Sequence, residues 1–289
     1  MDTANLSAFI KVAETGSFSI AAQQLFITQP AISKRIKQLE DDYASKLIDR
    51  KGKSIHLTQT GQALLPRARQ ILQDIQNMRQ HISDMEGSPM GALSMATSHH
   101  IGLHRLPPIL RAFTAHYPEV DLDLSFMDSE RACELIKNNQ LDLAVVTLPF
   151  AQSSKLEFKT IWVDELIVIC ARDHPLTLIT HPQLQDLTHH PAVLPSHGTY
   201  TRTAIESALA SVRDRLKINL ETNYLETIKM MVSVGLGWSI LPQNMLDDTL
   251  VHLKVSGFES SRNLGIILNK NHSHSKALSV MLELLVTED

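Results

Sequence analysis

The sequence of 289 residues predicts an α/β protein in which a small helical N-terminal part is joined by a long helix to a larger C-terminal part. Three observations support this expectation: helical spacing of apolar residues up to residue 43, an apolar heptad repeat over residues 64–85, and alternating strand and helix patterns from residue 89. The length suits about two domains. A hydrophobic fraction of 43% allows a substantial core.

Composition narrows the class of protein further. No apolar run approaches the roughly 18 residues of a transmembrane helix, and the first 16 residues lack the features of a secretory signal. Cys133 and Cys170 lie in apolar surroundings and in no C-x-x-C pair, so both are expected to be buried thiols in a reducing compartment. We therefore expect a cytoplasmic protein that does not contact a membrane.

Charge is distributed unevenly along the chain. The net charge is −4, yet residues 1–85 contain 11 basic and 8 acidic residues and are net positive. An electropositive surface is therefore expected on the N-terminal part alone.

The first 43 residues have the pattern of three short helices. Apolar residues in the segment 6–13 follow helical spacing, Gly16 suits the end of that helix, and Ser17 suits the start of the next. Thr28 is a good N-cap for a third helix, and Pro30 fits its first turn because no hydrogen bond is lost there. Two short helices, a tight turn and a third helix predict a helix-turn-helix.

The third helix has two distinct faces. Its apolar side chains cluster within about 40° at 100° per residue and predict a buried stripe of Ile32, Ile36, Leu39 and Tyr43. The opposite face and its edges suit the major groove of DNA, because Lys and Arg neutralise phosphates while Gln and Ser bond to base edges. A face that is merely solvated is the alternative. The residues of this face are Gln29, Pro30, Ser33, Lys34, Arg35, Lys37 and Gln38.

A short β-ribbon is predicted at residues 46–58, which alternate around Gly52. Its tip groups three cations, Arg50, Lys51 and Lys53. A basic ribbon beside a helix-turn-helix is a wing, and its cations would reach the flanking DNA backbone or the minor groove.

A long helix is predicted from Thr60, with apolar residues spaced by three and four positions as in a coiled coil. Residues 87–89 end it. This apolar stripe of the long helix is too long to be covered by the small N-terminal part, so a helix of a second chain is the expected partner. Packing of the stripe on its own domain is the alternative. The stripe consists of Ala68, Ile71, Ile75, Met78, Ile82 and Met85, widened by Leu64, Leu65 and Leu72.

From residue 89 strands alternate with helices, which predicts a mainly parallel sheet covered on both faces. Strands are expected at residues 93–95, 120–126, 141–148, 166–171, 192–194, 218–220 and 264–268, and helices at 103–113, 132–137 and 277–286.

Three loops after these strands are rich in hydroxyl groups: residues 97–100, 147–149 and 196–201. Open α/β sheets bind ligands beyond the carboxyl ends of their strands, so these loops are expected to form a small-molecule site; helix capping is the alternative. The expected binding residues are Thr97, Ser98, His99, His100, Thr147, Ser196, Gly198, Thr199 and Thr201. No metal site is expected, because adjacent histidines rarely bind one ion and no cysteine or carboxylate stands at zinc-site spacing.

The runs LSAFIKVAETGSFSIAAQQLFITQPAISKRIKQLE, LIDR and IHLTQTGQALL resemble the DNA-binding region of LysR-type transcriptional regulators, with GSF-x-x-AA-x-x-L, TQPAISK-x-I-x-x-LE and LT-x-x-G at the family's spacing. The resemblance implies that the TQP-x-x-S helix enters the major groove and that Arg50 contacts phosphate. Gln29, Pro30, Ser33 and Lys34 are then the chief further DNA contacts. It also implies a homodimer through the linker helix, commonly assembled into a homotetramer.

In that family the C-terminal part has two lobes resembling a periplasmic solute-binding protein. The resemblance implies a winged helix-turn-helix domain over residues 1–59, a coiled-coil linker and dimerisation helix over 60–88, and an effector-binding domain over 89–289. The first lobe would hold about 89–163 and 265–289 and the second about 164–264, with the chain crossing near Val163 and returning near Leu264.

The sequence departs from the family at Tyr43-Ala44 and at Leu47-Ile48. Because Ala44 lacks the freedom of glycine at positive φ, the end of the recognition helix is expected to close differently.

These features predict a transcriptional regulator that binds double-stranded DNA and whose operator binding is controlled by a small, anionic effector held between two lobes, without a cofactor. The C-terminal part by itself would also fit a solute-binding protein. No nucleophile elbow, P-loop or metal motif points to an enzyme.

Overall fold

The structure is a computed structural model that describes residues 2–51, 54–84, 87–151, 153–270 and 274–287. The chain forms two compact units. The N-terminal unit holds Met1–Ser88, and the C-terminal unit holds nearly all of the remainder, beginning at Pro89. Each unit has its own hydrophobic core. No helix among the described residues is long and apolar enough to cross a membrane.

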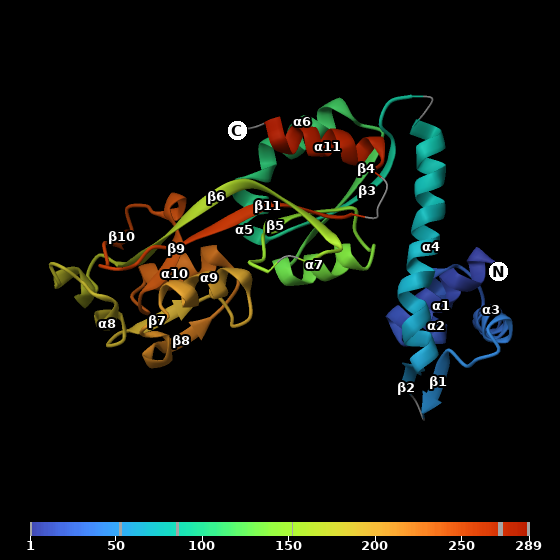
Figure 1. Ribbon diagram of the computed structural model, residues 1–289, viewed down its shortest axis with the longest axis horizontal. Coiled ribbons are helices and arrows are strands. Elements are labelled where there is room, and N and C mark those ends of the chain that lie inside the picture. Colours follow the sequence, from blue (N-terminus) through green and yellow to red (C-terminus); the bar gives the residue numbers. More distant parts are fainter. Residues whose placement is uncertain (1, 52–53, 85–86, 152, 271–273, 288–289) are drawn as a thin grey trace. The chain divides into compact units, whose positions relative to one another are not determined.

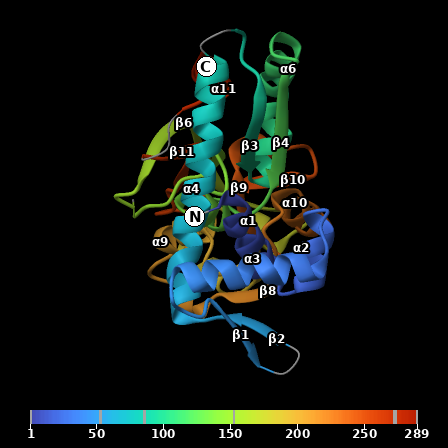
Figure 2. The same cartoon turned by 90° about the vertical axis from the view of Figure 1, so that its right-hand side faces the viewer.

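Three short helices and one long helix build the N-terminal unit, as the sequence predicts. They are α1 (Thr3–Thr15), α2 (Phe18–Gln24), α3 (Gln29–Asp42) and α4 (Gln59–Asp84). Helix α1 packs against the other three, and its Leu6 and Phe9 are fully buried. Gly16 ends α1 with a positive φ of 61°, and the Ser17 hydroxyl accepts a hydrogen bond from the Ile20 N–H at the start of α2. Helix α3 lies crosswise to α4 (Figure 2).

The buried stripe of α3 differs from the prediction at its C-terminal end. Ile32, Ile36 and Leu39 are buried, but Tyr43 is 42% exposed. The helix ends before Tyr43, so helical periodicity no longer places that side chain on the core side. Glu40 is buried in the last turn instead.

Ala44 adopts the left-handed conformation that glycine usually provides after a helix, with a φ of 48°. The Ser45 N–H then donates to the Glu40 carbonyl oxygen at 3.0 Å and closes α3. The expectation of a different closure is therefore wrong: the alanine takes the conformation of a glycine.

Replacing Ala44 by glycine should stabilise the N-terminal unit. A left-handed conformation costs most L-residues about 1–2 kcal/mol, and the greater freedom of glycine in the unfolded chain offsets part of that gain. We expect Ala44→Gly to raise the free energy of unfolding by about 0.5–1 kcal/mol, measured by denaturant titration of the helical circular dichroism signal. Ala31→Gly, inside α3, is the control and should lower it by a similar amount; equal signs for the two changes would contradict the assignment.

The predicted ribbon is present, with β1 (Ile48–Lys51) paired antiparallel to β2 (Ser54–Leu57). It extends beyond α3 and α4 (Figure 2). At its base an added Cβ on Gly61 would lie 2.1 Å from the Leu47 carbonyl oxygen, so the close approach of α4 to the ribbon requires glycine here.

The first half of the α4 stripe packs on its own unit. Ala68 is fully buried in the N-terminal core. The other α4 residues that pack against this core are Leu64, Leu65, Ile71 and Leu72. For this half of the helix, the alternative that the stripe packs on its own domain is correct, because α1 lies against α4. Met78 is 58% exposed, and Met85 and the side chain of Ile82 lie outside what the structure describes. A partner helix along the second half stays a prediction.

The C-terminal unit alternates strands and helices. Its strands are β3 (Gly91–Thr97), β4 (Val120–Phe126), β5 (Leu143–Thr147), β6 (Leu156–Ala171), β7 (Pro191–Leu194), β8 (Lys217–Glu221), β9 (Ser239–Pro242), β10 (Leu250–Leu253) and β11 (Ser261–Asn269). Its helices are α5 (His99–His104), α6 (Leu106–His116), α7 (Ser129–Lys137), α8 (Leu184–Leu187), α9 (Tyr200–Ala208), α10 (Leu225–Ser233) and α11 (Lys276–Thr287).

These elements form two lobes. In the first, β3 pairs parallel with β4 and β5, and α6 and α11 cover one face of the sheet while α7 covers the other (Figure 1). In the second, β7 pairs parallel with β8, and β9 and β10 pair antiparallel with β6. The sheet is thus mixed and not mainly parallel, because β6 and β11 pair antiparallel with each other and with their neighbours.

Strands β6 and β11 join the lobes and run side by side from one to the other (Figure 1). Val163 lies opposite Asn263, beside a register shift between Leu264 and Gly265. The crossing points predicted near residues 163 and 264 therefore face each other. An added Cβ on Gly265 would lie 2.1 Å from the Lys159 carbonyl oxygen, so the two strands approach closely at this point.

Candidate functional site

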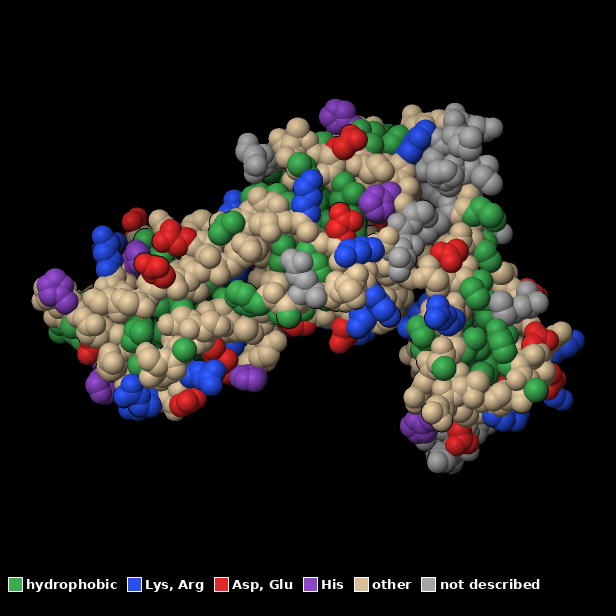
Figure 3. All heavy atoms as spheres, in the orientation of Figure 1, with side chains coloured by type: hydrophobic (Ala, Val, Ile, Leu, Met, Phe, Trp, Pro, Cys, Tyr) green, Lys and Arg blue, Asp and Glu red, His purple; other side chains and the backbone are tan. Residues whose placement is uncertain are grey.

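The predicted DNA-binding face of α3 is largely exposed. The exposed members are Gln29, Pro30, Lys34, Lys37 and Gln38, and Ser33 and Arg35 are half-buried at its edges. Lys and Arg side chains lie at the surface over α3 in the N-terminal unit (Figure 3). The acidic residues of the helix surface, Asp41 and Asp42, stand at its C-terminal end, away from Gln29.

The structure describes the base of the wing but not the side chains around its tip. Arg50 and Lys51 belong to β1, but their side chains lie outside the described part of the chain, as does the whole of Lys53. Contact of these three cations with DNA therefore stays a prediction.

Glu40 connects α3 to the wing, a role that the sequence does not reveal. Its carboxylate is 9% exposed and accepts hydrogen bonds from the Leu47 N–H at 2.9 Å and the Ile48 N–H at 3.3 Å, and it pairs with the Lys46 ammonium at 2.8 Å. Burial raises the pKa of Glu40, but these hydrogen bonds together lower it below its usual value. The ionised carboxylate thus positions the start of β1 against α3.

A cavity of about 430 Å³ lies between the lobes of the C-terminal unit. It forms at the carboxyl ends of β3, β5 and β7, where α7, α9 and α10 begin. One side is aromatic: the His99 ring packs edge-on against Phe126 and Tyr224, with centroids 5.9 and 5.2 Å away. We call this space the interlobe cavity.

Six of the nine predicted effector residues line the interlobe cavity, namely Ser98, His99, His100, Thr147, Thr199 and Thr201. Thr97 does not: it is fully buried in β3, and its hydroxyl donates to the Val145 carbonyl oxygen at 2.8 Å. Ser196 and Gly198 line a neighbouring surface groove instead, whose lining shares Thr199 with the cavity.

Helix capping explains some of these hydroxyl groups but not all. The Thr199 hydroxyl accepts from the Arg202 N–H at 3.2 Å and caps α9. Ser98 stands at the N-cap of α5, yet its hydroxyl makes no capping hydrogen bond. The Thr201 hydroxyl accepts from the Arg262 guanidinium at 2.9 Å. Helix capping therefore explains the Thr199 hydroxyl but does not account for the hydroxyl groups of Ser98 or Thr201.

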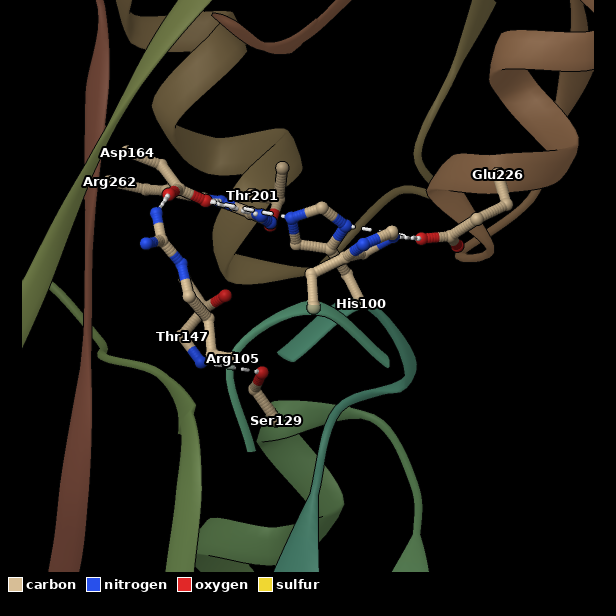
Figure 4. A network of polar contacts seen from close by, with 9 residues as sticks. His100, Arg105, Ser129, Thr147, Asp164, Thr201, Glu226 and Arg262 are labelled. Carbon is tan, nitrogen blue, oxygen red and sulfur yellow. Dashed lines mark hydrogen bonds and ion pairs between the residues drawn. The ribbon is translucent and has the colours of Figure 1, made fainter. Parts of the chain in front are cut away.

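A buried ion cluster underlies the cavity (Figure 4). The Asp164 carboxylate on β6 is 1% exposed and meets the Arg262 guanidinium on β11 at 2.9 Å and the Arg105 guanidinium at 3.1 Å. Asp164 and Arg262 are direct partners in the register of the two crossing strands. Burial lowers the pKa of Arg262, and the adjacent Asp164 charge opposes that shift. The cluster thus holds the strands together where the lobes meet.

Two histidines of α5 meet a carboxylate of α10 beside this cluster. His100 Nδ1 lies 3.1 Å and His104 Nε2 2.9 Å from Glu226 Oε1. Burial lowers the pKa of His100, although its contact with Glu226 acts in the opposite direction. For Glu226, burial raises the pKa, but the hydrogen bonds with His100, His104 and its own backbone lower it to about 2.

Two carboxylates, those of Asp128 and Glu130, also line the cavity, together with Arg131. The Glu130 carboxylate accepts from the Tyr200 N–H and so occupies the start of α9. Asp128 accepts from the Asn223 side chain at 2.9 Å. Burial and the nearby Asp128 raise the pKa of Glu130.

Sequence reasoning missed Arg105, Asp164, Glu226 and Arg262. Asp164 and Arg262 carry only a weak signal, since β6 holds three further charged residues (Glu157, Lys159 and Glu165) and Arg262 lies between the polar residues Ser261 and Asn263. Arg105 and Glu226 carry none, because each belongs to an ordinary amphipathic helix region.

Comparison with known proteins supplies the family. Residues 3–62 match the model of "Bacterial regulatory helix-turn-helix protein, lysR family", and residues 86–289 match "LysR substrate binding domain". The chain is 30% identical over 286 residues to the HTH-type transcriptional activator CmpR of a Synechocystis species, covering 97% of this chain and 93% of that protein.

Solved structures share the fold. A full-length OxyR variant of Pseudomonas aeruginosa is similar with a TM-score of 0.74 and 20% identity, covering 99% of this chain and 94% of that one. Full-length CbnR in complex with its target DNA is similar with a TM-score of 0.66 and 22% identity, covering 99% of both chains. With both family models matched in their expected order along nearly the whole chain, this protein belongs to the LysR family of DNA-binding transcriptional regulators and carries that family's effector-binding domain.

Proposed function

We propose that this protein regulates transcription by binding operator DNA through α3 and the wing, and that a small anionic effector in the interlobe cavity controls this binding. The observation that carries the proposal is the cavity itself: polar side chains from both lobes converge beside the two strands that join them. A ligand that contacts both lobes would favour one arrangement of them over another.

The proposed protein–DNA contacts are those of the exposed α3 face together with the wing cations. Gln29 and Ser33 would read base edges, while Lys34 and Arg50 would neutralise phosphates. Pairing through the second half of α4 would place two α3 helices on one operator, as half-site recognition requires. Further association of such dimers into a tetramer is part of the proposal.

The DNA contacts can be tested by comparing operator variants. Gln29→Ala and Ser33→Ala should each reduce the discrimination between correct and altered base pairs, by about 1–3 kcal/mol per lost contact. Lys34→Ala should instead weaken binding to all sequences alike and reduce the salt dependence by about one phosphate contact. Electrophoretic mobility shifts with DNA from beside the gene measure both. The proposal fails if the protein binds none of that DNA tightly and shows no steep salt dependence.

Several features of the cavity support an anionic effector. The hydroxyl groups of Ser98 and Thr201 and the Arg262 guanidinium face it, and three helices of nine residues start at its wall. Because Glu130 already occupies the start of α9, the anionic group is expected beside Ser98 rather than at that helix start. The aromatic side formed by Phe126 and Tyr224 would hold an apolar part of the ligand.

Ser98→Ala should abolish the effector response and leave DNA binding intact, because the change removes a hydroxyl that faces the cavity and caps no helix. A thermal-shift screen of small carboxylates and phosphates on the unchanged protein identifies the ligand, which is then applied to the variant. Ser196→Ala is the matched control, since Ser196 lines the neighbouring groove. A normal response of the Ser98 variant would remove this loop from the effector site.

A solute-binding protein is the second candidate, because the C-terminal unit has two lobes around a cavity. The helix-turn-helix match over residues 3–62 favours the regulator. Curated relatives that match along the chain are regulators, which favours a non-catalytic role for the cavity.

A further inference from the structure

Three metal-ligating side chains converge next to the interlobe cavity, and the effector proposal does not use two of them. His100 and His104 project from the same side of α5, four residues apart, and Glu226 reaches them from α10 of the other lobe. Their ligand atoms all lie within 4.8 Å of one another. Two histidines at i and i+4 on a helix, completed by a carboxylate, form the ligand set of many three-ligand zinc sites. Sequence spacing gave no sign of this set, because Glu226 lies 122 residues from His104.

The distances suit an ion. Around a tetrahedral Zn²⁺ with bonds of about 2.0–2.1 Å, neighbouring ligand atoms are about 3.4 Å apart. His100 Nδ1 and His104 Nε2 lie 3.1 and 2.9 Å from the same oxygen, Glu226 Oε1. Both histidine–carboxylate separations are thus a few tenths of an ångström below this spacing, and all three ligand atoms lie within 4.8 Å of one another.

Two polar atoms of these three side chains are still free to form a bond. Among the described residues, His100 Nε2 and Glu226 Oε2 are buried and have no hydrogen-bond partner. His100 Nε2 faces the Asp164 carboxylate at 4.0 Å (Figure 4). If Nδ1 bound a metal, the proton would reside on Nε2 and would point at Asp164, which is the carboxylate–histidine–metal arrangement that orients metal ligands in proteins.

The surrounding charges permit a cation. Asp164 and Glu226 are both held in contact with positive or imidazole groups, and their two charges offset those of Arg105 and Arg262. An ion entering the triad therefore meets a cluster without a net positive charge. Imidazole and carboxylate ligands together favour zinc and its neighbours over magnesium or calcium.

We propose that His100, His104 and Glu226 form a binding site for a divalent transition metal ion of the zinc type, with a fourth position open to water or to a ligand in the interlobe cavity. Because α5 belongs to the first lobe and α10 to the second, the bound ion clamps the two lobes to each other. The site does not depend on the nature of the effector.

The test is calorimetric titration of ZnCl₂ into the full chain after treatment with a chelator. The expected result is one strong site per chain, and Co²⁺ in place of Zn²⁺ should give the intense visible absorption of a four-coordinate ion. Glu226→Gln keeps the size and the hydrogen-bond acceptor but loses the charge, and His104→Ala alters a side chain that is 45% exposed, so both variants should fold. Each should weaken binding at least tenfold and remove the cobalt spectrum.

Two histidine controls separate this site from adventitious binding. His116→Ala changes an exposed histidine of α6, and His190→Ala breaks the ring contact of His190 with His174, so both variants should bind zinc as the unchanged protein does. Zinc binding that persists in Glu226→Gln and His104→Ala, or that is lost in His190→Ala, would overturn the proposal. So would an absence of strong binding, which would leave the triad a hydrogen-bonded contact between the lobes. Because no DNA or effector is present, either outcome leaves the proposed function to be judged separately.

Discussion

Asp164→Ala should lower the free energy of unfolding of the C-terminal unit by about 3–5 kcal/mol. The carboxylate is 1% exposed and is the partner of two guanidinium groups, one of which, that of Arg262, is 5% exposed. Removing one member of a buried ion cluster leaves a desolvated charge without compensation, which costs far more than the pair contributes at a surface. Since Asp164 and Arg262 join β6 to β11, the loss also weakens the contact between the lobes.

Tryptophan fluorescence measures the unfolding of the C-terminal unit. The chain has two tryptophans, Trp162 and Trp238, and both lie in the C-terminal unit. Glu134→Ala is the control, because Glu134 forms an exposed pair with Arg131 whose side chains are 67% and 60% accessible, and it should change stability by less than about 0.5 kcal/mol. Equal losses in the two variants would show that the buried cluster does not hold the unit together.

Glu40→Ala should detach the wing from α3 and weaken DNA binding. The change leaves the buried Leu47 and Ile48 N–H groups without their acceptor, at about 1–3 kcal/mol for each group that stays unsatisfied. Hydrogen exchange at these two amides should accelerate, while amides inside α1 stay protected. Affinity for operator DNA should fall at least tenfold because the wing cations lose their fixed position.

The same carboxylate gives a pH signature. The folded-state pKa of Glu40 lies below its unfolded value of 4.5, so its stabilising contribution is complete above that value and is lost as the pH falls below it. Glu40→Gln keeps an acceptor oxygen but cannot ionise, so it should lose less stability than Glu40→Ala and should remove this acid-dependent step. Unchanged DNA affinity in Glu40→Ala, with unchanged exchange at both amides, would disprove the coupling of α3 to the wing.

Much of the N-terminal unit follows from local pattern. The end of α1, the starts of α2 and α3 and the β1–β2 ribbon lie where capping residues, Pro30 and alternation predict them. The two wrong predictions for this unit also have local causes. Tyr43 falls outside the buried stripe because α3 stops one residue earlier, and Ala44 takes a conformation that residue preference assigns to glycine.

The α4 stripe shows a different limit. A heptad pattern indicates that one side of a helix is buried but does not name what covers it. Ala68 is covered by the same chain, whereas Met78 is exposed in the single chain. Periodicity alone could not divide the stripe at this point.

The sequence by itself determined the family, the helix-turn-helix with the exposed polar face of α3, and the loops that supply Ser98, Thr147 and Thr201 to the cavity, because these depend on short-range spacing and on the ends of strands. Only the tertiary structure decided the chemistry beneath the cavity. Asp164 meets Arg262 across 98 residues and His104 meets Glu226 across 122. Such contacts follow from the antiparallel pairing of β6 with β11 and from the meeting of two lobes, and no local pattern of side chains encodes which distant residues will be placed within hydrogen-bond reach.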